Sequence, residues 1–136
     1  MNKYRQSFGK WGETIAENYL TEKGYRILER NIRTPYGELD IIASQKGIIP
    51  SGVQMERETI IVFVEVKTRS SDKYGLPEQA ITARKQEHLL SAAQYYLMEN
   101  PQLAEDWRVD VISIQSSTQG KQPKVTHFEN VFADEI

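Results

Sequence analysis

The sequence has 136 residues, a formal net charge of −2 and no cysteine. This length suits one domain, residues 1–136, built around one hydrophobic core, and the lack of cysteine excludes disulfides and thiolate metal sites. No apolar run approaches the ~20 residues of a membrane span, and the first residues lead into no apolar stretch, so we expect a cytoplasmic protein without a signal peptide or a membrane partner.

The first predicted element is a helix over residues 8–23. Its apolar residues recur at helical spacing and form one stripe: Phe8, Trp11, Ile15, Ala16, Tyr19 and Leu20. Ser7 is suited to cap the start of this helix and Gly24 to end it. Glu13 lies at the border of the stripe, so an acid stands beside the face that packs on the rest of the protein.

Three strands are predicted next, at residues 25–31, 38–44 and 59–68. A turn at residues 34–37 joins the first two. Between the second and third, residues 45–58 are predicted to form a long hairpin loop. The third strand is rich in β-branched and aromatic residues, which is typical of a central strand.

A second helix follows a polar connection at residues 70–77 and ends near Asn100. Two starts fit the sequence: Pro77 at the first helical position, or Thr82 as the N-cap. The inner stripe of this helix is formed by Leu89, Ala92, Ala93 and Tyr96.

Strands at residues 107–115 and 124–130 complete the pattern, with a turn at residues 116–120. Because a helix precedes the fourth strand, that strand can run parallel to the third, and the last strand is expected at an edge. The sequence therefore predicts an α/β fold with three α/β/α layers, in which helices flank a mixed sheet of four to five strands.

Charged residues interrupt two of these apolar strands. Glu65 and Lys67 lie two residues apart in the third strand and point to the same face, and Asp40 interrupts the second strand. If these strands pair, facing Cβ atoms lie about 5 Å apart, and a cation between the carboxylates would remove their repulsion. Mg²⁺ takes one or two carboxylates together with water and phosphate oxygens. The pattern therefore indicates a phosphodiester-hydrolysing site, with Glu13 as a third acid and Lys67 stabilising charge on the phosphate.

A buried ion pair fits the same spacing equally well. Glu65 with Lys67, or Asp40 with Lys67, would then serve only the fold, since short acid–base patterns also occur by chance.

The start of the second helix adds an independent observation. If the helix begins at Thr82, Arg84 and Lys85 oppose the helix dipole in the first turn, which favours a bound anion such as phosphate. If it begins at Pro77, a solvated Arg84 and a Lys85 lying over the core fit at least as well.

Other polar residues are assigned structural roles. Asp110 either pairs with Arg108 or Lys67 or assists the site, and the structural role is favoured. His88 and His127 are isolated in the sequence, and they indicate no zinc site.

Motifs spread over nearly the whole chain carry a family resemblance. They are Gly12-Glu13-x-x-Ala16, Gly24-Tyr25-x-Ile27-Leu28-x-Arg30-Asn31, Gly37-Glu38-Leu39-Asp40-Ile41-Ile42-Ala43, Val62-Phe63-Val64-Glu65-Val66-Lys67-Thr68-Arg69, Gly75-x-Pro77-x-x-Ala80-Ile81, Lys85-Gln86 and Arg108-x-Asp110-Val111-Ile112. Together they resemble the uncharacterised bacterial YraN-like family. The resemblance implies the restriction-endonuclease-like fold of the PD-(D/E)xK nucleases, closest to archaeal Holliday-junction resolvases.

By this resemblance, Asp40, Glu65 and Lys67 take the places of the motif's Asp, Glu and Lys. Glu13 takes the place of the acid on the first helix, and Leu39 stands where a proline often precedes the motif Asp. The resemblance thus implies a catalytic set in which Asp40 and Glu65 hold Mg²⁺ or Mn²⁺. The candidate substrate-binding residues are Arg69, Arg84 and Lys85.

The function expected from these features is a divalent-metal-dependent nuclease acting on branched or otherwise structured DNA. The alternative is a non-catalytic nucleic-acid-binding protein, or an adaptor in DNA processing, which the net negative charge together with a modest basic patch motivates. An RNA substrate stays open, because no residue is identified that reads a 2′-hydroxyl. Action on a four-way junction requires two sites related by a two-fold axis, which a homodimer would supply.

Overall fold

The computed structural model describes residues 3–46, 59–70, 82–103, 106–116 and 122–132. Its elements in chain order are α1 (Lys3–Glu22), β1 (Arg26–Thr34), β2 (Gly37–Lys46), β3 (Thr59–Arg69), α2 (Ala83–Glu99), β4 (Asp106–Gln115) and β5 (Lys124–Phe128). The five strands form one sheet in the order β1-β2-β3-β4-β5. Only β3 and β4 run parallel, and the other neighbours are antiparallel, so the predicted mixed sheet is confirmed.

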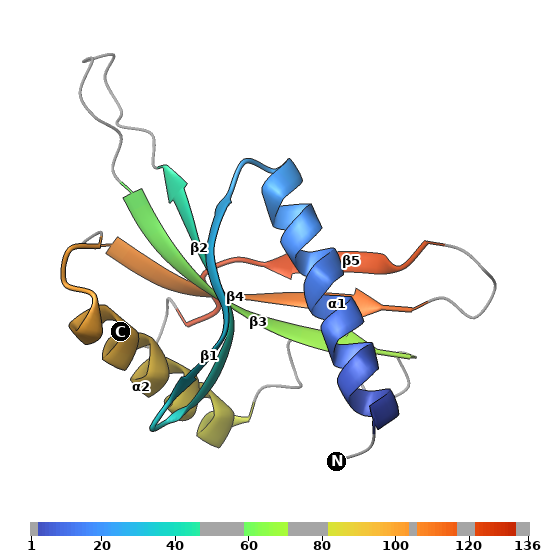
Figure 1. The fold of residues 1–136 in the computed structure, drawn as a ribbon, viewed down its shortest axis with the longest axis horizontal. Coiled ribbons are helices and arrows are strands. Elements are labelled where there is room, and N and C mark those ends of the chain that lie inside the picture. The colour runs from blue at the N-terminus through green and yellow to red at the C-terminus, as the bar shows by residue number, and fades with distance from the viewer. Residues whose placement is uncertain (1–2, 47–58, 71–81, 104–105, 117–121, 133–136) are drawn as a thin grey trace.

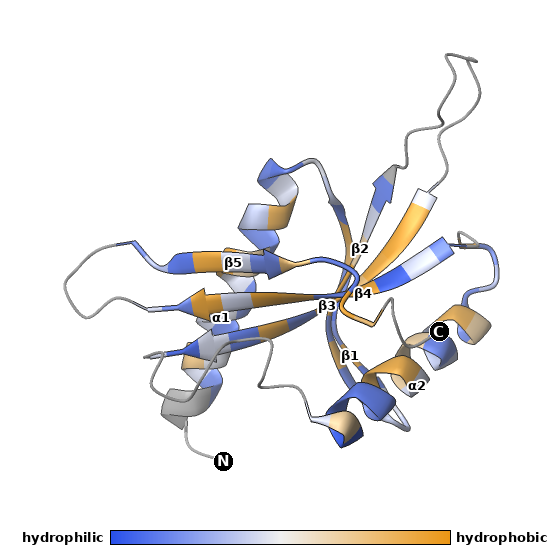
Figure 2. Cartoon of the chain, turned by 180° about the vertical axis from the view of Figure 1, so that it is seen from behind, coloured by the Kyte–Doolittle hydropathy of each residue, from blue (hydrophilic) through white to orange (hydrophobic). Residues whose placement is uncertain are grey.

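The two helices lie against the sheet (Figure 1), and each is held there by its own apolar cluster. The cluster under α1 includes Ala16 and Leu20, and the cluster under α2 includes Leu89 and Ala93. Along β3, Phe63 packs with α2, whereas its neighbours in sequence pack with α1, as the alternation of a strand requires. The apolar residues concentrate in β3 and β4, and β1 is more hydrophilic (Figure 2). The three-layer α/β/α architecture is therefore confirmed.

Helix α1 differs from its prediction at one end. It begins at Lys3 rather than at residue 8, so Ser7 lies inside the helix and the prediction of its cap was wrong. No glycine or proline stands among residues 3–7 to stop the helix. The predicted end is confirmed: Gly24 has φ +93°, and the N–H of Tyr25 bonds to the Leu20 carbonyl at 3.0 Å. This is the capping geometry that glycine allows.

Helix α2 begins at the second of its two predicted starts. Thr82 is the N-cap, and its Oγ1 atom accepts a hydrogen bond of 3.1 Å from the backbone N–H of Lys85. The alternative start at Pro77 and the connection at 70–77 fall largely outside the described residues. Neither described helix has both the length and the apolar character needed to cross a membrane.

Several strand limits also needed correction. The strands β1 and β2 extend further than predicted, to Thr34 and Lys46, and β5 ends at Phe128 rather than at residue 130. Gln45 and Lys46 are therefore part of a strand, and residues 47–58 of the predicted loop lie outside the described residues. The turn at 116–120 lies outside them too, apart from Ser116.

The sheet divides at one end. Within the described residues, β2 and β3 pair from Lys46 opposite Thr59 to Ile41 opposite Val64. Beyond that point β2 continues beside β1, and β3 continues beside β4. Figure 1 shows the β1–β2 hairpin turning downward while β3, β4 and β5 extend to the right. Two strands that bear the predicted acids thus separate just where those acids occur.

Helix α1 touches β3 closely beside this division. Gly12 is buried, and a Cβ atom there would overlap the Thr68 hydroxyl and lie 3.1 Å from the Thr68 Cβ. We expect Gly12→Ala to lower the free energy of unfolding by about 1–3 kcal/mol, because overpacking pushes helix and strand apart. Urea unfolding measures this change.

Gly9→Ala is the matched control, since no atom lies within 4 Å of a Cβ at that position of the same helix. This variant should gain up to about 1 kcal/mol from the higher helix propensity of alanine. Equal effects of the two substitutions would contradict the close approach of α1 to β3.

Candidate active site

The division of the sheet brings the predicted strand residues together. The Oδ2 atom of Asp40 accepts a hydrogen bond of 2.9 Å from the backbone N–H of Val66. Glu65 is almost fully buried, and its Oε1 atom lies 3.6 Å from Nζ of Lys67. The side chain of Lys67 remains 27% exposed, so the cluster is open to solvent on one side.

A second lysine reaches the same acid from α2. Nζ of Lys85 lies 3.3 Å from Oε1 of Glu65, closer than that of Lys67. Its position depends on the helix beginning at Thr82, which sets Lys85 in the first turn above the end of β3. The sequence left two interpretations of Lys85 open, a contact with a bound anion or a position over the core. Its ammonium group contacts an acid of the cluster, so a position over the core alone is wrong.

Glu13 approaches the cluster from α1 and is held by a residue to which sequence reasoning gave no role. Nη2 of Arg30, on β1, lies 3.5 Å from Oε1 of Glu13, and Nη1 lies 2.7 Å from Oε2 of Glu17. The spacing of Glu13 and Glu17 by one helical turn was a usable signal, since both point to one side. Nothing in the sequence identified Arg30 as their partner.

The electrostatics of the cluster centre on Asp40. Burial is the main cause that raises the pKa of Asp40 to about 8, and the charge of Glu65 adds to it. The hydrogen bond from the N–H of Val66 acts in the opposite direction, and the charge of Glu13 raises the pKa further. Asp40 therefore lies within the electrostatic field of two other acids, one from α1 and one from β3.

These acids were tested for their fit to a metal. The described part of the chain contains no group of three or more acidic, histidine or cysteine side chains arranged to hold an ion. Mg²⁺ needs fewer, because it keeps several waters and takes one or two carboxylates. Among the described residues, Oε2 of Glu65 and Oε1 of Glu13 are buried without a hydrogen-bond partner. Such atoms are rare in proteins and fit an oxygen-liganded cation with its water shell.

The ion pair that the sequence left as an alternative is also present. Glu65 pairs with Lys67, whereas Asp40 has no ion-pair partner among the described residues. A purely structural ion pair between Glu65 and Lys67 would leave the position of Asp40 beside a second acid unexplained. The structural ion pair and the metal site therefore involve different atoms of one cluster.

The remaining predicted binding residues lie at its border. Arg69 follows Lys67 by two residues on the same face of β3, and its backbone carbonyl accepts a hydrogen bond from Ser116. Arg84 is exposed in the first turn of α2, next to Lys85.

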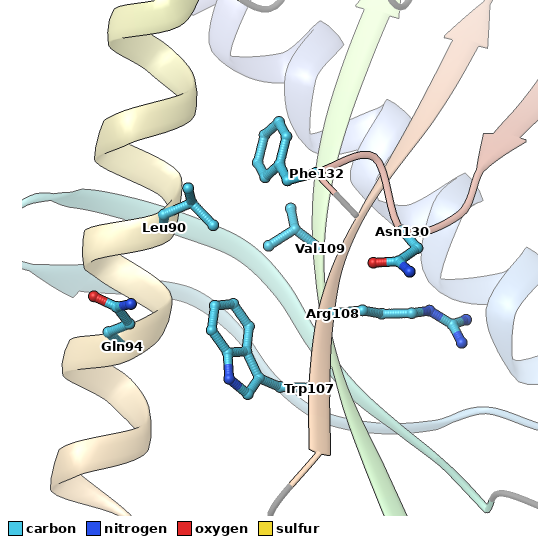
Figure 3. Close-up of a pocket in the computed structure, with 7 residues that line it drawn as sticks. All are labelled: Leu90, Gln94, Trp107, Arg108, Val109, Asn130 and Phe132. Atoms are coloured by element: carbon cyan, nitrogen blue, oxygen red, sulfur yellow. The ribbon is translucent and has the colours of Figure 1, made fainter. Parts of the chain in front are cut away.

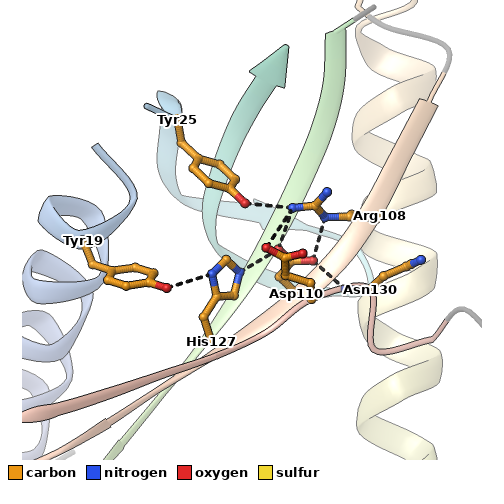
Figure 4. Close-up of polar contacts among 7 residues, drawn as sticks. Tyr19, Tyr25, Arg108, Asp110, His127 and Asn130 are labelled. Atoms are coloured by element: carbon orange, nitrogen blue, oxygen red, sulfur yellow. Dashed lines mark hydrogen bonds and ion pairs between the residues drawn. The ribbon is translucent and has the colours of Figure 1, made fainter. Parts of the chain in front are cut away.

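A second polar cluster lies apart from the acids, between α1 and the β4–β5 edge (Figure 4). Asp110 is fully buried and accepts hydrogen bonds from the guanidinium of Arg108 and the N–H of Asn130. Nε2 of His127 lies 2.8 Å from Oδ2 of Asp110, and its Nδ1 lies 3.3 Å from the Tyr19 hydroxyl. The expected Asp110–Arg108 pair is confirmed, and the fold gives His127, which is isolated in the sequence, two partners that the sequence did not predict.

The Asp110 cluster is a structural junction. Burial alone would raise the pKa of Asp110, but hydrogen bonds from His127, Arg108 and the N–H of Asn130 hold it below its usual value. Every bond to its carboxylate comes from a residue of the chain, and the side chain has no exposed surface. These features leave it no access to a substrate.

A pocket of about 360 Å³ opens between α2 and β4 (Figure 3). It is lined by Leu90, Gln94, Trp107, Arg108, Val109, Asn130 and Phe132. Trp107 and Val109 point toward α2, whereas the guanidinium of Arg108 points away toward Asp110 (Figures 3 and 4). None of the predicted catalytic residues lines this pocket, so it is separate from the acids.

The fold and the acids define an α/β protein with a carboxylate–lysine cluster at the division of a mixed sheet. Residues 12–114 match the model of the uncharacterised protein family UPF0102, and the chain belongs to this family. The matched part includes Glu13, Asp40, Glu65 and both lysines of the cluster, but not His127. The family membership that the motifs predicted is confirmed.

Individual relatives match over nearly their whole length. The chain is 42% identical over 132 residues to a UPF0102 protein of Syntrophotalea carbinolica, covering 97% of this chain and 96% of the relative. It is 42% identical over 127 residues to one of Syntrophomonas wolfei, covering 93% and 98%. A relative from Alkaliphilus oremlandii is 43% identical over 134 residues, covering 97% of this chain and 100% of its own length.

The raised pKa of Asp40 gives a testable dependence of stability on pH. Because the folded-state pKa of about 8 exceeds the unfolded value of roughly 3.9, the stability of the wild type falls as pH rises between these values. In buffer without divalent cations, Asp40→Asn should therefore be more stable than wild type at pH 9, and this advantage should shrink toward pH 4. Urea unfolding at several pH values measures it.

Glu38→Gln removes an exposed acid from the same strand and serves as the control. It should track the wild type at each pH. An Asp40→Asn advantage that does not grow with pH would contradict the burial of a charge at residue 40.

The lowered pKa of Asp110 has the opposite sign. Its stabilisation is complete above the unfolded value of roughly 3.9 and is lost as pH falls through the folded-state pKa. At pH 7 we expect Asp110→Asn to cost about 3–5 kcal/mol, because it leaves a buried guanidinium without its partner. Asp106→Asn, an exposed acid of the same strand, should change stability by less than about 0.5 kcal/mol. Urea unfolding from pH 7 to pH 3 compares the two variants with the wild type. Equal stability of Asp110→Asn and the wild type at pH 7 would contradict the structural role of the Asp110 cluster.

Proposed function

We propose that the protein is a divalent-metal-dependent nuclease that hydrolyses phosphodiester bonds of DNA, with branched or otherwise structured DNA as its substrate. The observation that carries the proposal is the meeting of Asp40, Glu65 and Lys67 where β2 and β3 separate. Acids buried at such a point cost stability, and this is typical of groups kept for function.

Asp40 and Glu65 are the residues that would hold the ion, either Mg²⁺ or Mn²⁺. When bound, the ion would neutralise the acids and polarise the scissile phosphate. The unpartnered oxygen of Glu65 and the missing counter-charge of Asp40 support this assignment. Glu13 adds a third acid, whose charge acts on Asp40.

The lysines supply positive charge from two directions. Lys67 stands on the strand beside Glu65 and would stabilise the negative charge that grows on the phosphate as the P–O bond breaks. Lys85 is 41% exposed and would bind a phosphate of the substrate strand from the first turn of α2. Arg69 and Arg84 would extend this contact to neighbouring phosphates.

The preference for structured DNA is inferred from the resemblance to resolvases. Cleavage of both strands of a junction would need a homodimer with two sites related by a two-fold axis. Sedimentation of the protein alone and with junction DNA tests this assembly.

A non-catalytic nucleic-acid-binding protein is the second candidate. It is favoured by the ion pairs that Glu65 makes with two lysines. In this case, salt-dependent binding to DNA or RNA should survive Asp40→Asn and Glu65→Gln, and no cleavage should accompany it.

The test is cleavage of labelled duplex, single-stranded and four-way-junction DNA in Mg²⁺ or Mn²⁺. We expect cleavage by the wild type and a loss of about 10²–10³-fold in rate for Lys67→Ala, because the variant lacks the charge that stabilises the transition state. Chelation of the metal should abolish the reaction.

Lys23→Ala is the matched control, since Lys23 is exposed and lies at the far end of α1. It should cleave at the wild-type rate. The nuclease proposal is lost if the pure protein cleaves none of these substrates, or if Lys67→Ala cleaves as fast as wild type.

A further inference from the structure

Arg30 makes two unequal contacts with α1. Its Nη1 atom lies at hydrogen-bond distance, 2.7 Å, from Oε2 of Glu17, whereas its Nη2 atom lies 3.5 Å from Oε1 of Glu13. The second distance is an ion pair but not a hydrogen bond, and Oε1 of Glu13 is buried without a hydrogen-bond partner among the described residues. Glu17 thus holds the guanidinium by a hydrogen bond, and Oε1 of Glu13 still has its capacity to accept one.

The location of Arg30 connects α1 to the acids. Arg30 pairs with Ile41 across β1 and β2, so it lies beside the residue that follows Asp40. Its planar fork can address two acids at once, which a single ammonium group cannot do in the same geometry. Glu13, in turn, is close enough to Asp40 for its charge to act there.

We propose that Arg30 is a positioning residue that holds Glu13 beside Asp40 and leaves Oε1 of Glu13 available to the water shell of a divalent ion bound at Asp40 and Glu65. This inference rests on the metal site of the proposed function and adds a residue to it. Residues that orient the groups around an ion commonly change its affinity by about 10–100-fold when they are lost.

The test is a double-mutant cycle measured by calorimetric titration with Mn²⁺, so that its readout does not require cleavage. Arg30→Gln and Glu13→Gln should each weaken Mn²⁺ binding by about tenfold or more, and the double variant should be no weaker than either single one. Arg26→Gln, an exposed arginine of the same strand, is the control and should bind as the wild type does.

Thermal unfolding of each variant separates positioning from a role in the fold alone. If Arg30 only stabilises the fold, Arg30→Gln lowers the melting temperature and leaves Mn²⁺ affinity unchanged, which overturns the proposal. Losses that multiply in the double variant also overturn it. If Arg30→Gln fails to fold, Arg30→Lys replaces it in the cycle and should still weaken Mn²⁺ binding.

The outcome for the wild type distinguishes this proposal from the nuclease itself. A wild type that binds Mn²⁺ but cleaves no DNA ends the nuclease proposal, and the cycle still decides the role of Arg30. A wild type that binds no Mn²⁺ overturns both.

Discussion

The hydrogen bond between the Asp40 carboxylate and the backbone N–H of Val66 determines the shape of the site. A strand N–H that has lost its neighbouring strand must find another acceptor, or it carries the cost of an unpaired polar group. Asp40 supplies that acceptor from β2 just beyond the last pair of β2 and β3. The side chain of Asp40 therefore satisfies a backbone group that the separation of β2 and β3 exposes.

This arrangement concentrates negative charge where water is scarce. Glu65 is paired with two lysines and Glu13 with Arg30, whereas Asp40 has no ion-pair partner among the described residues and accepts a hydrogen bond from the neutral N–H of Val66. Burial, with the charges of Glu65 and Glu13, raises the pKa of Asp40 to about 8. A cation between Asp40 and Glu65 would reverse this balance, which is why the cluster is better explained by a function than by the fold.

The sequence was most informative where a residue conflicted with its surroundings. Glu65 and Lys67 in an apolar strand, and Asp40 in another, could be found by alternation alone, and Thr82 could be identified as one of two caps. Partners distant in the chain could not be found this way. The contact of His127 with Tyr19, 108 residues apart, arises only when β5 pairs with β4 and α1 covers the sheet. The roles of Arg30 and Lys85 likewise depend on how their elements pack.

The start of α1 was misjudged because helix formation needs no apolar residue, only the absence of a stop signal.

Helix α1 is fixed at points on both sides of the sheet division. Gly12 contacts Thr68 on β3, Glu17 is hydrogen-bonded to Arg30 on β1, and Tyr19 reaches His127 on β5. A wider division would break at least one of these contacts, because a helix cannot stretch to follow two diverging strand pairs. Glu13 lies between the first two of these points. Its position relative to Asp40 therefore depends on how α1 packs on β3 and β1.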